Sequence, residues 1–135
     1  MILVMDTAAP EAFIGLWKEG WKAKTSWEAG RNLSSQILEK LDDIYKEAGI
    51  NLVETEKIIV NSGPGSYTGL RIGLSATNAL AYSRNIPTVG IQAPENCEDL
   101  LNKGLIELKN LKTFNGSALP EYGSEPNITE PKKTF

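Results

Sequence analysis

The sequence of 135 residues contains no histidine and one cysteine, Cys97. Without histidine, neither a Ser-His-Asp nor a Cys-His catalytic site can form, and a histidine-ligated metal is excluded. Any acid-base chemistry would fall to aspartate, glutamate, lysine or tyrosine. A single cysteine excludes an internal disulfide and is typical of proteins kept in a reducing compartment, so we expect a cytoplasmic protein.

Long apolar runs and basic clusters are also scarce. The opening run MILVM is interrupted by Asp6, so we expect neither a signal peptide nor a membrane span. The formal net charge is −3, and the only dense basic stretch is Lys132-Lys133. Because direct binding of nucleic acid normally requires a basic face, any contact with nucleic acid is expected to be indirect.

The residues that are present predict an α/β domain. Apolar and β-branched runs predict five strands, and two longer periodic stretches predict helices. The order is β-β-β-α-β-α-β, which predicts a mixed five-stranded sheet because strand-helix-strand crossovers make parallel neighbours. The expected strands are Ile2–Thr7, Ala12–Trp17, Trp21–Glu28, Lys57–Ser62 and Ile86–Gln92, and the expected helices are Leu33–Ala48 and Ser66–Arg84.

The last third of the chain is less regular. Residues Glu95–Asn102 predict a short helix, and LIELKN (Leu105–Asn110) predicts a short strand. From Phe114 the sequence is rich in Gly, Pro, Ser, Asn and Glu, which predicts an irregular tail. We therefore divide the chain into a lobe, residues 1–113, and a tail, residues 114–135, which Leu119 and Tyr122 are expected to anchor on the lobe.

A glycine-rich turn, GPGSYTG, joins the fourth strand to the second helix. The backbone N–H groups around Gly63, Gly65 and Ser66 lie at a helix start and could bind an anion. However, Leu70-Arg71 follows where a Walker loop would carry its lysine, and the spacing is not a dinucleotide fingerprint. The alternative is a tight turn that uses the permissive dihedrals of glycine.

The end of the first strand offers a second candidate for phosphate binding. Asp6-Thr7 precedes a hairpin, as an acidic residue does in actin-like phosphotransfer proteins. The turn TAAPEA contains Pro10 and no glycine, which disfavours close approach to phosphate, so a strand-end aspartate that accepts turn hydrogen bonds is the alternative. The candidate nucleotide-facing residues are therefore Asp6, Thr7, Gly63, Gly65, Ser66 and Arg71.

Glycine inside the second helix predicts a close neighbour. Gly69 and Gly73 lie four residues apart and share a face that Ala76 and Leu80 continue. Each glycine costs about 1 kcal/mol relative to alanine in a helix, so two of them indicate that something approaches the backbone closely. The wide apolar arc of this helix indicates that it packs on the sheet and also on a second body. That second body is either a partner or the chain's own first helix.

Three segments of the chain resemble those of a known family. The first is ILVMDT (Ile2–Thr7). The second is the first-helix stretch RNLSSQILEKLDDIYKEAGI (Arg31–Ile50), and the third is IIVNSGPGSYTGLRIGLSATNALAYSRNIPTVGI (Ile58–Ile91). They are similar to the TsaB family of bacterial tRNA threonylcarbamoyladenosine biosynthesis proteins, formerly grouped with glycoproteases. The resemblance runs from Met1 to about Ile91, and GPGSYTGLRIG is its most specific part.

The resemblance implies a single actin-like (ASKHA, ribonuclease H-like) lobe and a subunit without catalytic activity of its own. Its implied partners are a TsaD-like catalytic subunit, a TsaE-like ATPase and a second copy of itself, with tRNA contacted only indirectly and no membrane involved. It implies no cofactor on this chain alone, with ATP or ADP and Mg expected only in the complex. The two helices form the pairing surface in that family, which makes Leu33, Ile37, Leu41, Ile44, Gly69, Ile72, Gly73 and Ala76 the candidate interface residues.

Two departures from the family pattern affect these expectations. Leu33-Ser34-Ser35 stands where members usually carry His-Ser-Glu, and most of the second lobe is missing between Gln92 and the tail. A two-lobed nucleotide cleft therefore cannot form from this chain alone. Two other classes remain open: an actin-like enzyme, either a peptidase or a small phosphotransferase, and a nucleotide-sensing subunit that holds ATP or ADP near Gly63–Ser66.

Overall fold

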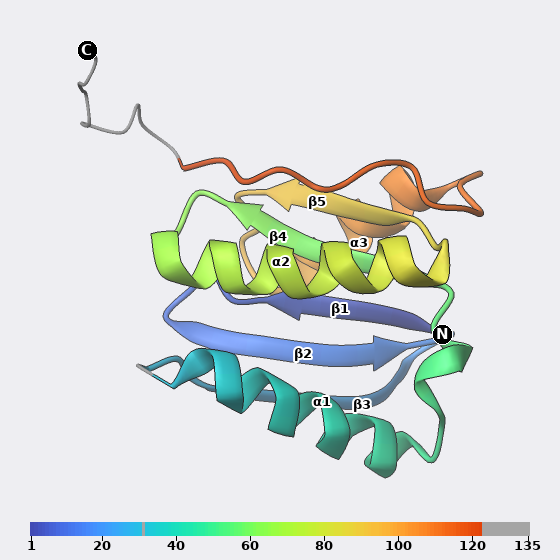
Figure 1. The fold of residues 1–135 in the computed structure, drawn as a ribbon, viewed down its shortest axis with the longest axis horizontal. Helices are drawn as coiled ribbons and strands as arrows, with labels where there is room; N and C mark the ends of the chain where they lie inside the picture. Colours follow the sequence, from blue (N-terminus) through green and yellow to red (C-terminus); the bar gives the residue numbers. More distant parts are fainter. Residues whose placement is uncertain (31, 123–135) are drawn as a thin grey trace.

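In the computed structural model, which describes residues 1–30 and 32–122, a five-stranded mixed sheet carries helices on both faces (Figure 1). The order across the sheet is β3-β2-β1-β4-β5; β1, β2 and β3 are antiparallel neighbours, whereas β4 is parallel to β1 and to β5. The predicted mixed sheet and its element order are confirmed. The elements are β1 (Ile2–Asp6), β2 (Glu11–Trp17), β3 (Trp21–Glu28), α1 (Leu33–Ala48), the 3-10 helix η1 (Leu52–Glu54), β4 (Lys57–Gly63), α2 (Tyr67–Arg84), β5 (Thr88–Gln92) and α3 (Cys97–Leu108).

The sheet has an apolar core on each face because successive strand residues point to opposite sides. In β1, Leu3 and Met5 belong to the cluster under α1 and α2, whereas Val4 belongs to the cluster under α3. Figure 1 shows α1 and α2 side by side on one face and α3 behind the sheet. None of the helices in the described part of the chain is long and apolar enough to cross a membrane.

The predicted strand at Leu105–Asn110 is wrong, because α3 continues as a helix to Leu108. The Asn96 side chain caps the start of α3 by accepting a hydrogen bond from the Asp99 backbone N–H at 2.8 Å. The buried side of α3 follows helical spacing, and Gly104 allows the helix to pack directly on Ile59. The buried residues of this helix are Leu100, Leu101, Gly104 and Leu108.

The C-terminal segment, residues 111–122, forms neither helix nor strand and lies along β5 (Figure 1). The Asn78 side chain of α2 both donates to the Ala118 carbonyl and accepts from the Ala118 N–H, each at 2.8 Å. The Asn115 side chain accepts from the Thr88 N–H of β5 at 3.1 Å. Side-chain amides, together with a backbone hydrogen bond from the Glu121 N–H to the Ser62 carbonyl of β4 at 2.7 Å, therefore hold this segment to the lobe in place of a strand ladder.

The two expected anchors of the tail behave differently. The Tyr122 ring lies against the Tyr67 ring with centroids 4.7 Å apart, as expected of an anchor. Leu119 is 76% exposed, so its assignment as an anchor is wrong. Residues 123–135 of the predicted tail lie outside the described residues.

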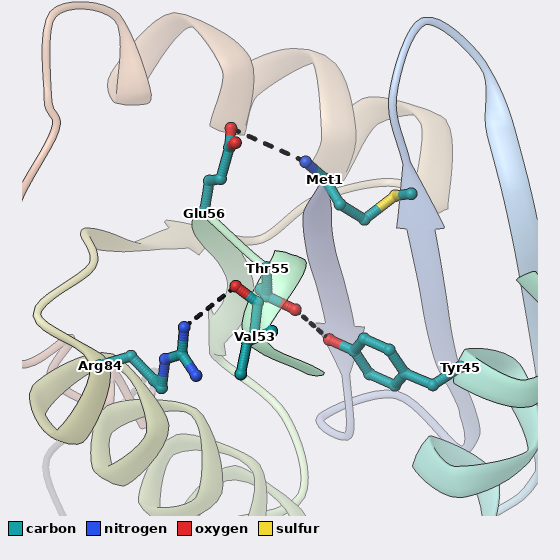
Figure 2. Close-up of polar contacts among 6 residues, drawn as sticks. All are labelled: Met1, Tyr45, Val53, Thr55, Glu56 and Arg84. Carbon is teal, nitrogen blue, oxygen red and sulfur yellow. Dashed lines mark hydrogen bonds and ion pairs between the residues drawn. The ribbon is translucent and has the colours of Figure 1, made fainter. Parts of the chain in front are cut away.

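The loop between α1 and β4 ties together the C-terminal ends of α1 and α2 (Figure 2). The Tyr45 hydroxyl of α1 is hydrogen-bonded to the Thr55 hydroxyl. Arg84, the last residue of α2, donates from Nη2 to the Val53 carbonyl at 3.0 Å. Because both helices are attached to the same short loop, their separation at this end is fixed.

Burial raises the pKa of the Tyr45 hydroxyl above its usual value of 10.0, against the opposing effects of the Thr55 hydrogen bond and the Arg84 charge. The folded protein therefore favours neutral Tyr45, and this contribution is complete below about pH 10 and is lost as the pH rises further. We predict that Tyr45→Phe lowers the free energy of unfolding by about 1 kcal/mol at neutral pH, because the Thr55 hydroxyl loses its partner. Above about pH 10 the variant should lose stability less steeply than the wild type.

Urea unfolding at a series of pH values measures both effects. Tyr82→Phe is the matched control, because Tyr82 is 74% exposed. Its alkaline stability profile should follow that of the wild type. If the Tyr45 and Tyr82 variants show the same alkaline slope, the Tyr45 hydroxyl does not contribute in this way.

Candidate partner-binding face

A groove of about 550 Å³ separates α1 from α2 on the outer side of the helix pair. Leu38, on the α1 side of the groove, is 70% exposed, although leucine is mostly buried in folded proteins. The α2 bank carries Ile72 and Ala76, which are half-buried. The lining residues are Ser34, Ile37, Leu38, Thr68, Arg71, Ile72, Ser75 and Ala76.

The structure buries five of the eight candidate interface residues. Leu33, Ile37 and Ile44 are almost fully buried in the core between α1 and the sheet. Gly69 and Gly73 are buried on the side of α2 that faces Thr7. An amphipathic stripe faces the sheet first, so these residues contact the lobe's own core, and Ile37 also forms the base of the groove. Their contribution to an interface stays a prediction. The other three candidates, Leu41, Ile72 and Ala76, are half-buried.

Leu38 is the groove residue that sequence reasoning missed. It lies beside the apolar stripe of α1 and is absent from the eight candidate interface residues. Ile37, its neighbour, is buried at the base of the groove, whereas Leu38 projects from the bank. A large apolar residue next to an already complete stripe was the available signal for an exposed contact.

The close neighbour predicted by the two glycines is Thr7, at the end of β1. A Cβ atom at position 69 would overlap the Thr7 carbonyl oxygen, and one at position 73 would overlap the Thr7 side chain. The Thr7 hydroxyl also donates to the Gly69 carbonyl at 2.6 Å. The prediction of close backbone approach is therefore confirmed, but the approaching body is the chain's own sheet.

Asp6 serves the turn that follows β1. Its Oδ1 atom accepts hydrogen bonds from the Ala8 N–H at 2.9 Å, the Ala9 N–H at 3.2 Å and the Asn61 side-chain amide at 3.1 Å. Asn61 in turn accepts from the Gly63 N–H at 2.8 Å. This arrangement agrees with the alternative interpretation of Asp6 as a strand-end residue that organises a turn.

The other candidate nucleotide-facing residues also contact their own chain. Gly63 has a positive φ of 104° and faces the backbone of Glu121, while Gly65 packs against Ala8. The Ser66 hydroxyl caps α2 by accepting from the Gly69 N–H at 3.1 Å. The structure does not bring the six candidates together into one pocket: Asp6 borders a crevice at the strand ends, whereas Arg71 lines the groove between α1 and α2.

The crevice beyond the ends of β1 and β4 has a volume of about 690 Å³ and an acidic lining. Asp6, Glu11 and Glu95 supply three carboxylates, and Lys24 supplies the single cation. This charge balance repels phosphate. Within residues 1–30 and 32–122, no three acidic or cysteine side chains are grouped closely enough to hold a metal ion.

Known proteins similar to this chain fall into two related groups. The family model described as "TsaD: tRNA N6-adenosine threonylcarbamoyltransferase" matches residues 27–110. The "tRNA threonylcarbamoyladenosine biosynthesis protein TsaB" of Escherichia coli (strain K12) is 31% identical over 90 residues, which are 67% of this chain and 39% of that protein. A "tRNA N6-adenosine threonylcarbamoyltransferase" of Bacillus subtilis is 35% identical over 63 residues, 47% of this chain and 18% of that protein.

Among solved structures, YeaZ from Pseudomonas aeruginosa superposes with a TM-score of 0.64 at 26% identity. The superposition covers 69% of this chain and 44% of the YeaZ chain. It confirms the predicted α/β lobe. The chain spans about two fifths of the length of the TsaB proteins that it matches, 39% for the Escherichia coli protein.

We predict that Gly69→Ala destabilises the fold, because the new methyl group would overlap the Thr7 carbonyl and push α2 away from β1. Overpacking typically costs about 1–3 kcal/mol, whereas alanine restores about 1 kcal/mol of helix propensity. The expected net loss is therefore up to about 2 kcal/mol, measured by urea unfolding. Ser75→Ala on the exposed side of α2 is the control and should change stability by less than about 0.5 kcal/mol. A Gly69→Ala protein at least as stable as the wild type would contradict this packing.

Proposed function

Because the chain belongs to the TsaD family and its relatives include TsaB proteins, we propose that it is a non-catalytic scaffold subunit in the threonylcarbamoyladenosine modification of tRNA. In this proposal the chain pairs with a TsaD-like catalytic subunit, and a TsaE-like ATPase joins the pair. tRNA is contacted through the partner, in the cytoplasm. The family match and the names of the relatives support the pathway, and the α1–α2 groove supports the mode of action.

The observation that carries the proposal is the exposed apolar groove on a lobe whose own core is already filled. Both faces of the sheet are covered, by α1 and α2 on one side and by α3 on the other. Leu38 is therefore not needed to complete the fold, whereas Ile72 packs partly against the core. This apolar groove at the surface of a filled lobe supports a protein-binding site there.

The strand-end crevice favours a scaffold over an enzyme. Asp6, the residue best placed for catalysis, already accepts three hydrogen bonds through one oxygen from its own chain. Cys97 borders the same crevice, but the sequence has no histidine to act as its base. The acidic lining does not suit the phosphates of a phosphotransferase substrate.

We further propose that ATP or ADP, with Mg²⁺, binds only in the assembled complex and not to this chain alone. The turn at Gly63–Ser66 supports this, because Ser66 and Gly63 are engaged by α2 and by the C-terminal segment. A nucleotide-sensing role would require a site that the partner helps to build. The alternative to a TsaD-like partner is a second copy of the chain in the same groove.

We predict that Leu38→Asp weakens binding to the TsaD-like protein of the same organism by roughly 10- to 100-fold. The substitution removes a leucine contact that the complex would bury, and it introduces a charge there. Stability should hardly change, since Leu38 is already exposed. The matched control is Ile106→Asp, which places the same charge at a 72% exposed apolar residue of α3, on the opposite face. Isothermal titration calorimetry measures the affinities.

Unchanged affinity of Leu38→Asp would contradict the proposed docking face. Equal losses for the Leu38 and Ile106 variants would point to a general effect of added negative charge. If wild-type chain alone sediments as a dimer that Leu38→Asp dissociates, and the TsaD-like protein does not bind, the groove serves self-association instead.

A nucleotide titration separates the scaffold from the enzyme and sensor alternatives. We predict that the isolated chain neither binds ATP or ADP at millimolar concentration nor hydrolyses ATP or protein substrates, because its strand-end groups are engaged and its crevice is acidic. The mixture with the TsaD-like partner should bind nucleotide. Steady ATP turnover by the purified chain that Asp6→Asn abolishes would overturn the non-catalytic assignment.

A further inference from the structure

Arg71 is the only charged residue among those that line the α1–α2 groove. It is exposed, and its guanidinium carbon lies 5.4 Å from the centroid of the Tyr67 ring. Within residues 1–30 and 32–122, no carboxylate lies within ion-pair distance of Arg71. The groove is therefore neutral apart from one cation, the Arg71 guanidinium, which makes a cation–π contact with Tyr67 and no ion pair with the described residues.

The C-terminal segment supports this arginine from behind. The Tyr67 ring, which contacts the Arg71 guanidinium, also lies against the Tyr122 ring with an angle of 33° between the two rings. Tyr122 is held in place because its neighbour Glu121 donates its backbone N–H to the Ser62 carbonyl of β4 at 2.7 Å. A chain of contacts therefore runs from the end of β4 through Tyr122 and Tyr67 to the groove.

We infer that Arg71 is the specificity determinant of the docking face and that it recognises a carboxylate of the partner. This inference rests on the proposed function, because it concerns the same groove. Docking would remove water from the guanidinium, which is costly unless the partner supplies hydrogen-bond acceptors of opposite charge. A carboxylate fits best, since it can accept two parallel N–H bonds from the planar guanidinium.

The charge pattern selects a different protein over a second copy of this chain. A second copy laid groove against groove would present Ser34, Ile37, Leu38 and the other lining residues, none of which carries a carboxylate. It would also bring a second Arg71 into the interface. The occupant that satisfies the groove is therefore a partner surface with apolar residues and one acidic residue facing Arg71.

The same structure assigns Tyr122 as a positioning residue for Arg71. Without Tyr122, Tyr67 loses its ring contact and the guanidinium loses its fixed support. Removing Tyr122 should therefore weaken binding only when Arg71 is present. That dependence separates a positioning role from a direct contact between Tyr122 and the partner.

The test measures binding of the full chain to its TsaD-like partner for Arg71→Glu, Arg71→Ala, Arg71→Lys and the charge-matched control Lys112→Glu on the exposed loop after α3. Arg71→Glu should weaken binding on the order of 10- to 100-fold and Arg71→Ala by less. Arg71→Lys should keep part of the affinity, and Lys112→Glu should keep nearly all of it. The dissociation constant of the wild type should rise with salt more steeply than that of Arg71→Ala.

A double-mutant cycle tests the support by Tyr122. Tyr122→Ala should weaken binding about 3- to 10-fold in the wild-type background and have almost no further effect in the Arg71→Ala background. Equal effects in both backgrounds would overturn the positioning role. If Leu38→Asp abolishes binding while Arg71→Glu behaves like Lys112→Glu, the docking face stands and the inference about Arg71 fails. If the partner binds and neither variant weakens binding, the docking face and the inference both fail. If the wild-type chain does not bind the TsaD-like protein at all, the proposed function fails.

Discussion

The close approach of α2 to the end of β1 at Thr7 determines how the rest of the lobe is arranged. Gly69 and Gly73 let the helix backbone reach Thr7, whose hydroxyl donates to the Gly69 carbonyl at 2.6 Å. With its glycine row against the sheet, α2 turns Ile72 and Ala76 toward α1. The same rotation exposes Arg71 in the groove. One short contact in the core thereby decides which residues reach the docking face.

Local patterns predicted the fold well wherever one periodicity dominated. The β-rich runs gave the strands to within a few residues, and the apolar repeat of α1 placed both of its ends. LIELKN was misassigned because six residues are too few to distinguish strand alternation from helix periodicity. The course of residues 111–122 could not be predicted, since it depends on Asn78 and Asn115, which contact residues 27 or more positions away and leave no periodic signal.

The candidate site was harder to predict because a sequence shows which face is apolar and does not show what covers it. The apolar pattern of α1 fits an interface and a core equally well. In the structure, Leu33, Ile37 and Ile44 are buried against the sheet. The glycine pair correctly indicated a close neighbour, but Thr7 is 62 residues away from Gly69 in the chain. Leu38 carried the better signal, because an apolar residue beyond a complete stripe has no partner inside the lobe.

The groove between α1 and α2 is held at one end by groups that do not line it, and α2 has a further support at its other end. At the C-terminal ends of the helices, Tyr45 and Arg84 attach both helices to the loop before β4 (Figure 2). At the N-terminal end of α2, the Tyr67 ring contacts both Tyr122 and the guanidinium of Arg71. A partner that docks on a surface fixed in this way has less conformational entropy to remove, so more of its contact energy appears as affinity. The polar groups at the strand ends are used for turns and caps, as the Asp6 and Ser66 hydrogen bonds show, and this supports the proposal of a scaffold role.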